Sequence, residues 1–160
     1  MFSFIKYIIV SFTSVLSMYI IKIHIRFINS LAYFTGNIGL LSIDIDGNDY
    51  WIWDAITVVE PDIIICEYNS VFGSRRAITI PYKNNFYLLD YHYSNLYFGA
   101  SLKALCQLAS KKGYVFVGSN SAGSNAFFVK KEKADRLVKF SAEDGYVISK
   151  FRSSRNEKVN

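Results

Sequence analysis

Carboxylates and side-chain amides follow two apolar runs near the middle of this sequence. Asp44 and Asp46 come at the end of the first run, and Glu67 and Asn69 come at the end of the second. In an open α/β sheet, ligands bind beyond the carboxyl ends of the strands. A carboxylate at such a strand end needs a partner or a ligand to offset its loss of hydration. These side chains are therefore candidates for the rim of a pocket.

Three chemistries can use this pattern. The first is methyl transfer, in which carboxylates and amides hold a cofactor or an acceptor. The second is the haloacid-dehalogenase phosphatase pattern, in which the first aspartate of Asp-x-Asp-Gly is the nucleophile and the second is a general acid. That pattern usually continues with threonine, where this chain has Asn48, and no convincing acidic pair for Mg²⁺ follows downstream. The third is a glycosyltransferase Asp-x-Asp that holds a metal and a sugar nucleotide.

A purely structural interpretation of the same residues also stays open. Asp46-Gly47-Asn48-Asp49 has the composition of a tight turn that leads into a helix. Asn48 or Asp49 would then serve as the helix cap. Asp44 fits this interpretation less well, because apolar Ile45 follows it directly.

The residues around the acidic cluster predict alternating strands and helices. Residues 38–45 and 62–67 are short apolar runs, typical of buried parallel strands. Residues 50–59 between them predict a helix that Pro61 ends. Residues 70–98 form a long aromatic loop, and loops of that length often carry function.

The second half of the chain predicts one more helix and a hairpin. Residues 101–112 carry an apolar face at helical spacing, and Gly113 ends that helix. Residues 114–117 and 126–129 are short strands joined by a turn. The whole pattern predicts an α/β sheet with an antiparallel edge.

Residues 1–37 form a hydrophobic N-terminal segment. Its uncharged run, residues 7–21, is shorter than the roughly 20 residues of a membrane-spanning helix. Two alternatives stay open: a membrane-surface segment or short anchor with membrane contact through residues 7–21, and a buried element or non-native start. Residues 21–27 alternate between apolar and polar types, which predicts a strand.

The charge distribution and the cysteines limit which classes of partner the chain can bind and in which cellular compartment it lies. The net charge of +5 comes from both ends, because residues 1–43 carry +3, residues 44–129 carry −2 and residues 130–160 carry +4. We therefore predict no nucleic-acid partner. Cys66 and Cys106 lie in apolar runs without metal-ligand spacing, which favours buried free thiols in a reducing compartment. We therefore expect a cytoplasmic chain, with association to a membrane as the alternative.

Several sequence blocks follow one another in the order of a known family. They are LLSIDIDGNDYW at 40–51, IICEYN at 64–69, YFGASL at 97–102, KGY at 112–114 and AGSNAFFV at 122–129. These blocks, within residues 38–131, resemble the C-terminal half of FkbM-like class I S-adenosylmethionine-dependent methyltransferases.

The resemblance implies a fold and roles for the residues. Residues 38–45 and 62–67 would be strands four and five of a Rossmann-like sheet, and the hairpin would supply strands six and seven. Asp44 and Asp46 would face the S-adenosylmethionine cofactor, and with Glu67 they would be the catalytic residues. The substrate-binding residues would be Asn48, Tyr68 and Asn69. The partner would be an unknown methyl acceptor, and no metal follows from the resemblance.

The sequence departs from the family before residue 38. Such a fold begins with a strand and a glycine-rich turn that holds the cofactor, but Gly36 is the only glycine before Ile38. We therefore expect a truncated domain with little independent cofactor affinity, completed by a missing N-terminal half or a partner chain. The alternative is a non-catalytic interaction or membrane-associated protein. Residues 132–160 are expected to form a basic, partly helical tail.

Overall fold

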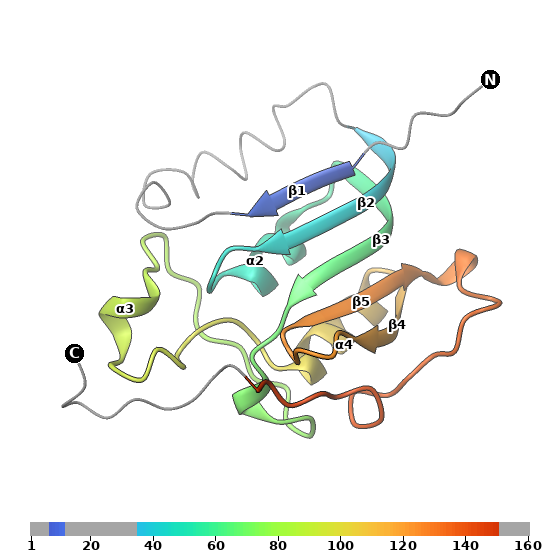
Figure 1. Cartoon of the computed structure of the whole chain (residues 1–160). Coiled ribbons are helices and arrows are strands. Elements are labelled where there is room, and N and C mark those ends of the chain that lie inside the picture. Colours follow the sequence, from blue (N-terminus) through green and yellow to red (C-terminus); the bar gives the residue numbers. More distant parts are fainter. Residues whose placement is uncertain (1–6, 12–34, 151–160) are drawn as a thin grey trace.

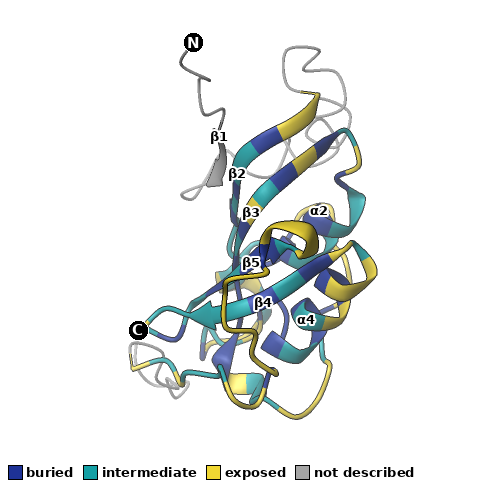
Figure 2. Ribbon diagram, turned by 90° about the vertical axis from the view of Figure 1, so that its right-hand side faces the viewer, coloured by how far each residue is buried: buried dark blue, intermediate teal, exposed yellow. Residues whose placement is uncertain are grey.

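One mixed β-sheet forms the centre of the molecule. The computed structural model describes residues 7–11, by their backbone alone, and residues 35–150. The five strands lie in the order β1-β2-β3-β5-β4, and α2 and α4 pack on one face of the sheet (Figures 1 and 2). The strands are β1 Tyr7–Ser11, β2 Gly36–Asp44, β3 Val59–Glu67, β4 Tyr114–Ser119 and β5 Asn125–Lys130. The helices are α2 Asp49–Ala55, α3 Leu88–Tyr91 and α4 Leu102–Lys111, with short 3-10 turns η1 Ser70–Phe72 and η2 Lys131–Lys133.

The strand pairing places three carboxyl ends at one edge of the sheet. β1, β2 and β3 are parallel neighbours, with Ser11 opposite Asp44 and Ile43 opposite Cys66. β5 runs antiparallel to both β3 and β4. The predicted α/β sheet with a terminal antiparallel pair is therefore confirmed.

The helix predicted over residues 50–59 is shorter than expected. α2 ends at Ala55, and Val59 already belongs to β3. The β-branched residues 57–59 favour an extended backbone, which explains the early end. The prediction that Pro61 ends a helix is also wrong, because Pro61 lies inside β3 opposite Ile38. β5 joins β3 only from Ile63 onward, so one side of Pro61 has no strand that needs its missing N–H.

The predicted helix over residues 101–112 is confirmed as α4. The Ser101 hydroxyl accepts a hydrogen bond from the Ala104 N–H at 3.2 Å, which is an N-cap. Gly113 follows the helix with φ of +86°, in the left-handed region that glycine tolerates best.

The hydrophobic core lies between the sheet and these two helices. Trp53 of α2 packs against Phe128 of β5 and Tyr114 of β4, with ring centroids 4.9 and 6.2 Å away. Leu105 of α4 is fully buried in the same cluster. In Figure 2 the buried residues lie on the strands and on the helices that pack against them.

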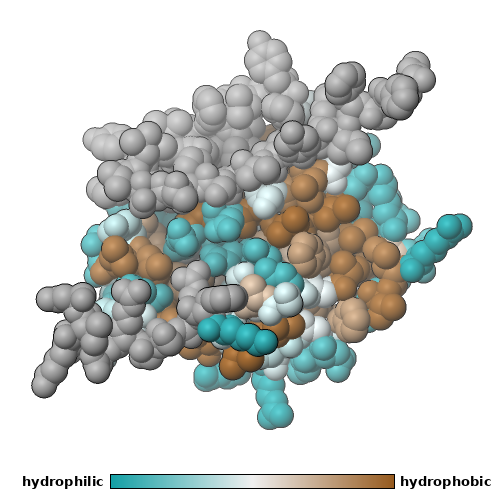
Figure 3. All heavy atoms as spheres, in the orientation of Figure 1, coloured by the Kyte–Doolittle hydropathy of each residue, from teal (hydrophilic) through white to brown (hydrophobic). Residues whose placement is uncertain are grey.

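The opposite face of the sheet is also apolar but less covered. Ile63 is 40% exposed there, and its neighbours on the same face, Ile65 and Phe127, are half-buried. Figure 3, drawn from this side, shows hydrophobic residues gathered on the surface.

One predicted loop has more local structure than expected, and the tail has less. The aromatic loop 70–98 contains η1 and α3, and its residues Ile80, Phe86 and Phe98 form a second small core. The tail was expected to be partly helical, but its described part has only η2. Beyond η2 the tail runs past β4, where the Phe140 N–H donates to the Phe116 carbonyl at 3.1 Å.

The predicted strand at residues 21–27 lies outside the described residues, and so does most of the run at 7–21. Its first part, residues 7–11, is strand β1. None of the described helices is long and apolar enough to cross a membrane.

Replacing Leu105 by alanine tests the position of the core. We expect Leu105→Ala to lower the free energy of unfolding by about 2–5 kcal/mol, because it leaves a cavity between α4 and the sheet. Leu89→Ala in α3 is the matched control; Leu89 is 56% exposed. The control should change the stability by less than about 0.5 kcal/mol. Urea unfolding measures both, and equal losses would contradict the described core.

Candidate functional site

Three carboxylates meet at the carboxyl edge of the parallel strands. Asp44 ends β2, Glu67 ends β3, and Asp46 lies two residues beyond Asp44. One carboxylate oxygen from each lies within 4.8 Å of the others. Glu67 is buried, with 6% of its surface exposed, whereas Asp44 and Asp46 reach solvent. The structure thus brings together the three residues predicted as catalytic, and oxygen groups this close can hold a cation or accept protons.

The turn that carries Asp46 is fixed by the aromatic loop. Asp46 has φ of +55°, a left-handed conformation that aspartate tolerates better than most residues. Any Cβ on Gly47 would overlap the ring of Phe86, so a glycine is required for the loop to pack there. The Gly47 carbonyl also accepts a hydrogen bond from the Gly99 N–H at 3.1 Å.

Asp49 anchors the same turn from inside. Its side chain is fully buried, and its two carboxylate oxygens accept the N–H groups of Ile45 at 3.0 Å and Gly47 at 2.9 Å. Burial raises the pKa of Asp49 to about 7, helped by the charge of Asp44, while the backbone N–H groups oppose the rise. Nothing in the local sequence pattern of Asp49, which is also that of a helix cap, indicated this role.

Asn48 connects the turn to the distant loop. Its amide donates to the Lys83 carbonyl at 2.7 Å and accepts the Lys83 N–H at 3.3 Å. The side chain is 1% exposed. Asn48 occupies the N-cap position of α2 but makes no side-chain cap bond. The Asn48 amide therefore holds the aromatic loop in place and does not cap α2 through its side chain.

Tyr68 and Asn69, the other predicted substrate-binding residues, are also engaged within the chain. The Asn69 amide donates to the carbonyls of Leu96 at 2.8 Å and Phe98 at 3.0 Å, which uses both of its hydrogens. The Tyr68 hydroxyl donates to the Val147 carbonyl at 2.6 Å. Both residues are buried, so they position the loop and the tail around the carboxylates.

An aromatic stack stands beside the acidic cluster. The rings of Phe86 and Tyr91 are stacked with centroids 4.8 Å apart, and Tyr97 follows Tyr91 at 5.6 Å. The Lys83 ammonium lies 5.5 Å from the Tyr91 ring centre. Because Phe86 contacts Gly47, this stack extends from the carboxylate turn to the partly exposed Tyr97. The many tyrosine and phenylalanine residues at 82–98 were the sign of this aromatic stack in the sequence.

Comparison with known proteins adds no identification: no protein-family model matches the chain, and neither curated proteins nor solved structures give a match.

The raised pKa of Asp49 predicts that the stability of the fold depends on pH. Its folded pKa near 7 lies above its ordinary value of 3.8, so the folded chain binds an extra proton between these values. The resulting stabilisation is complete below pH 3.8 and is lost as the pH rises through about 7. The loss should approach about 4 kcal/mol, and urea midpoints measured from pH 4 to pH 8 would record it.

Two variants test whether Asp49, and not another titrating group, causes the pH dependence of stability. Asp49→Asn keeps one acceptor oxygen and should flatten the pH dependence, although it lowers stability at acidic pH. Asp54→Asn removes a surface carboxylate that pairs with Lys111 at 3.7 Å and should keep the wild-type slope. An Asp49→Asn chain with the full wild-type slope would show that another group titrates.

Proposed function

We propose that residues 38–131 form the C-terminal half of an S-adenosylmethionine-dependent, FkbM-like methyltransferase domain. Asp44, Asp46 and Glu67 would face the cofactor and the methyl acceptor. The observation that supports this most is the meeting of these carboxylates at the ends of two adjacent parallel strands, in a sheet closed by an antiparallel pair. The segments that the resemblance would make strands four and five, residues 38–45 and 62–67, lie largely in β2 and β3.

The chemistry of the cofactor suits this edge of the sheet. S-adenosylmethionine carries a sulfonium cation and an ammonium group, and closely spaced carboxylates attract both. Its ribose hydroxyls can also donate to a carboxylate. When bound, the cofactor would supply an electrophilic methyl group to the acceptor. A carboxylate of the cluster would take the proton that the acceptor loses.

Cofactor affinity is expected to be weak in this chain alone. Strand β1 ends beside Asp44, where the resemblance would place a glycine-rich turn, but the residues after Ser11 are Phe-Thr-Ser. We propose that a second polypeptide segment supplies the remaining cofactor contacts. A non-catalytic interaction protein is the alternative that the following titration tests.

Titration followed by amide NMR tests the proposed site. S-adenosylmethionine at millimolar concentration should shift amides at residues 44–49 and 67–69. S-adenosylhomocysteine, which lacks the sulfonium charge, should bind about 2- to 5-fold more weakly. Asp46→Asn should weaken S-adenosylmethionine binding by a similar factor.

Asp54→Asn is the matched control, because its carboxylate lies on α2 away from the cluster and should leave the shifts unchanged. Shifts that are absent at millimolar cofactor, or located elsewhere, would contradict the methyltransferase proposal and favour the non-catalytic alternative.

A second candidate is a Mg²⁺-dependent phosphatase of the haloacid-dehalogenase type. The observation that favours it is the three-carboxylate cluster, because Mg²⁺ prefers carboxylate oxygens. Glu67 would complement Asp44 and Asp46 from the neighbouring strand. This function predicts Mg²⁺-dependent hydrolysis of p-nitrophenyl phosphate that Asp44→Asn abolishes. Hydrolysis that persists in Asp44→Asn, or that never depends on Mg²⁺, would exclude it.

A further inference from the structure

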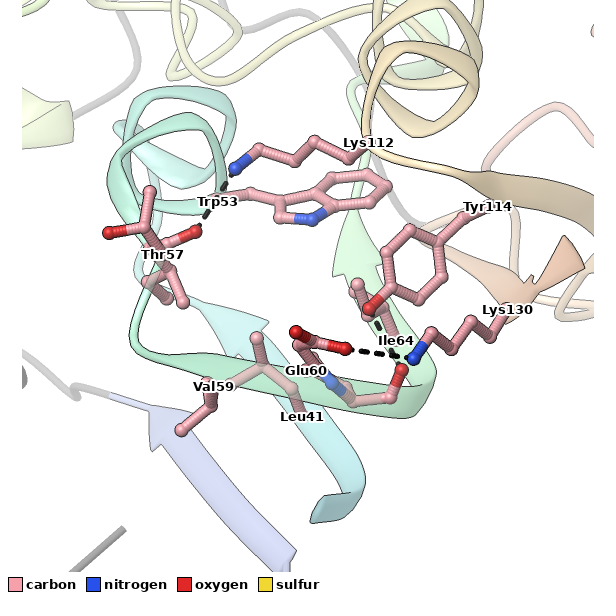
Figure 4. Close-up of a pocket in the computed structure, with 11 residues that line it drawn as sticks. Leu41, Trp53, Thr57, Val59, Glu60, Ile64, Lys112, Tyr114 and Lys130 are labelled. Atoms are coloured by element: carbon pink, nitrogen blue, oxygen red, sulfur yellow. Dashed lines mark hydrogen bonds and ion pairs between the residues drawn. The ribbon is translucent and has the colours of Figure 1, made fainter. Parts of the chain in front are cut away.

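A pocket lies at the opposite edge of the sheet from the acidic cluster. Its volume is about 400 Å³, in the range of small-molecule sites. Val59 lines it at the start of β3, about 25 Å from Glu67 at the end of the same strand, and Leu41 and Ile64 line it three residues before Asp44 and Glu67. Figure 4 shows its lining, which includes Leu41, Trp53, Thr57, Val59, Glu60, Ile64, Lys112, Tyr114 and Lys130.

The walls of the pocket are mostly apolar and aromatic. Leu41, Val59 and Ile64 of the sheet form one side, and the rings of Trp53 and Tyr114 form another (Figure 4). The Tyr114 hydroxyl donates to the Pro61 carbonyl at 2.8 Å, so this ring presents its apolar body to the space. An apolar ligand would therefore gain by leaving water here.

The two lysines of the pocket differ in their partners. Lys130 pairs with Glu60 at 2.9 Å and with Glu132 at 3.3 Å. Lys112 instead donates to the Ile56 carbonyl at 3.0 Å. Among the described residues, no carboxylate lies within ion-pair distance of Lys112.

Lys112 is thus a half-buried cation with spare donor capacity. An ammonium group has three hydrogens, and one is used on the carbonyl. Partial burial lowers the pKa of Lys112, as expected when an ammonium group loses hydration. An anion beside it would restore favourable electrostatics and accept a second hydrogen bond.

We propose that this pocket binds a small organic carboxylate with an aromatic or branched apolar body. The body would lie against Trp53 and Tyr114, and the carboxylate would pair with Lys112. The negative charge of Glu60 is weakened by its ion pair with Lys130 at 2.9 Å, although Lys130 also pairs with Glu132. This site is independent of the carboxylate cluster and of the function proposed for it.

Three probes of similar size but different charge test the proposal on the full chain. They are 3-phenylpropionate, 3-phenylpropanol and 3-phenylpropylamine, titrated at constant salt and followed by amide NMR. The propionate should shift amides that line the pocket and should bind about 5- to 10-fold more tightly than the alcohol. The amine should bind more weakly than the alcohol, because Lys112 repels it.

The adjacent lysines supply matched variants. Lys112→Met should bring propionate binding down to the level of the alcohol. Lys112→Gln keeps an N–H donor without the charge and guards against loss of the fold. Lys111→Met is the control, because Lys111 is largely exposed and pairs with Asp54. Equal binding of all three probes, no binding at millimolar concentration, or equal effects of the Lys111 and Lys112 variants would overturn the proposal.

Discussion

Parallel pairing of β2 with β3 determines where the charged side chains of this chain meet. The two strands end at the same edge, so Asp44 and Glu67 are neighbours there although many residues separate them in sequence. Asp46 joins them from the following turn. Like charges at this spacing repel, and the arrangement persists only because the surrounding chain holds the turn in place.

Buried polar side chains hold that turn in place. Asp49 accepts two backbone N–H groups inside the turn, and Asn48 ties it to Lys83 in the aromatic loop. Asn69 fixes the other end of the loop through Leu96 and Phe98. Buried polar groups that are hydrogen-bonded are expensive to disturb, so they hold the carboxylate edge rigid. Rigid positioning of oxygen ligands is what a cofactor or cation site requires.

Sequence reasoning located the elements better than the roles of single polar residues. Apolar runs, the apolar face of residues 101–112 and the Gly113 end signal placed β2, β3, α4 and the hairpin, because those signals are local. Pro61 misled the prediction, since a proline also fits a strand where one neighbour is absent. The partner of Asn48 lies 35 residues away and that of Tyr68 lies 79 residues away. Nothing local distinguishes an amide that binds a ligand from one that holds a loop.

The two edges of the sheet have opposite chemical character, and the topology explains why. At the carboxyl edge the parallel strands end in acidic turns. At the amino edge, antiparallel β5 ends where β3 begins, which brings Lys130 to Glu60, and the end of α4 brings Lys112 beside them. A carboxylate-rich edge attracts cations, whereas the half-buried Lys112 favours anions. The apolar middle of β2 and β3 connects the two regions, because Leu41 and Ile64 line the pocket while Asp44 and Glu67 end the same two strands.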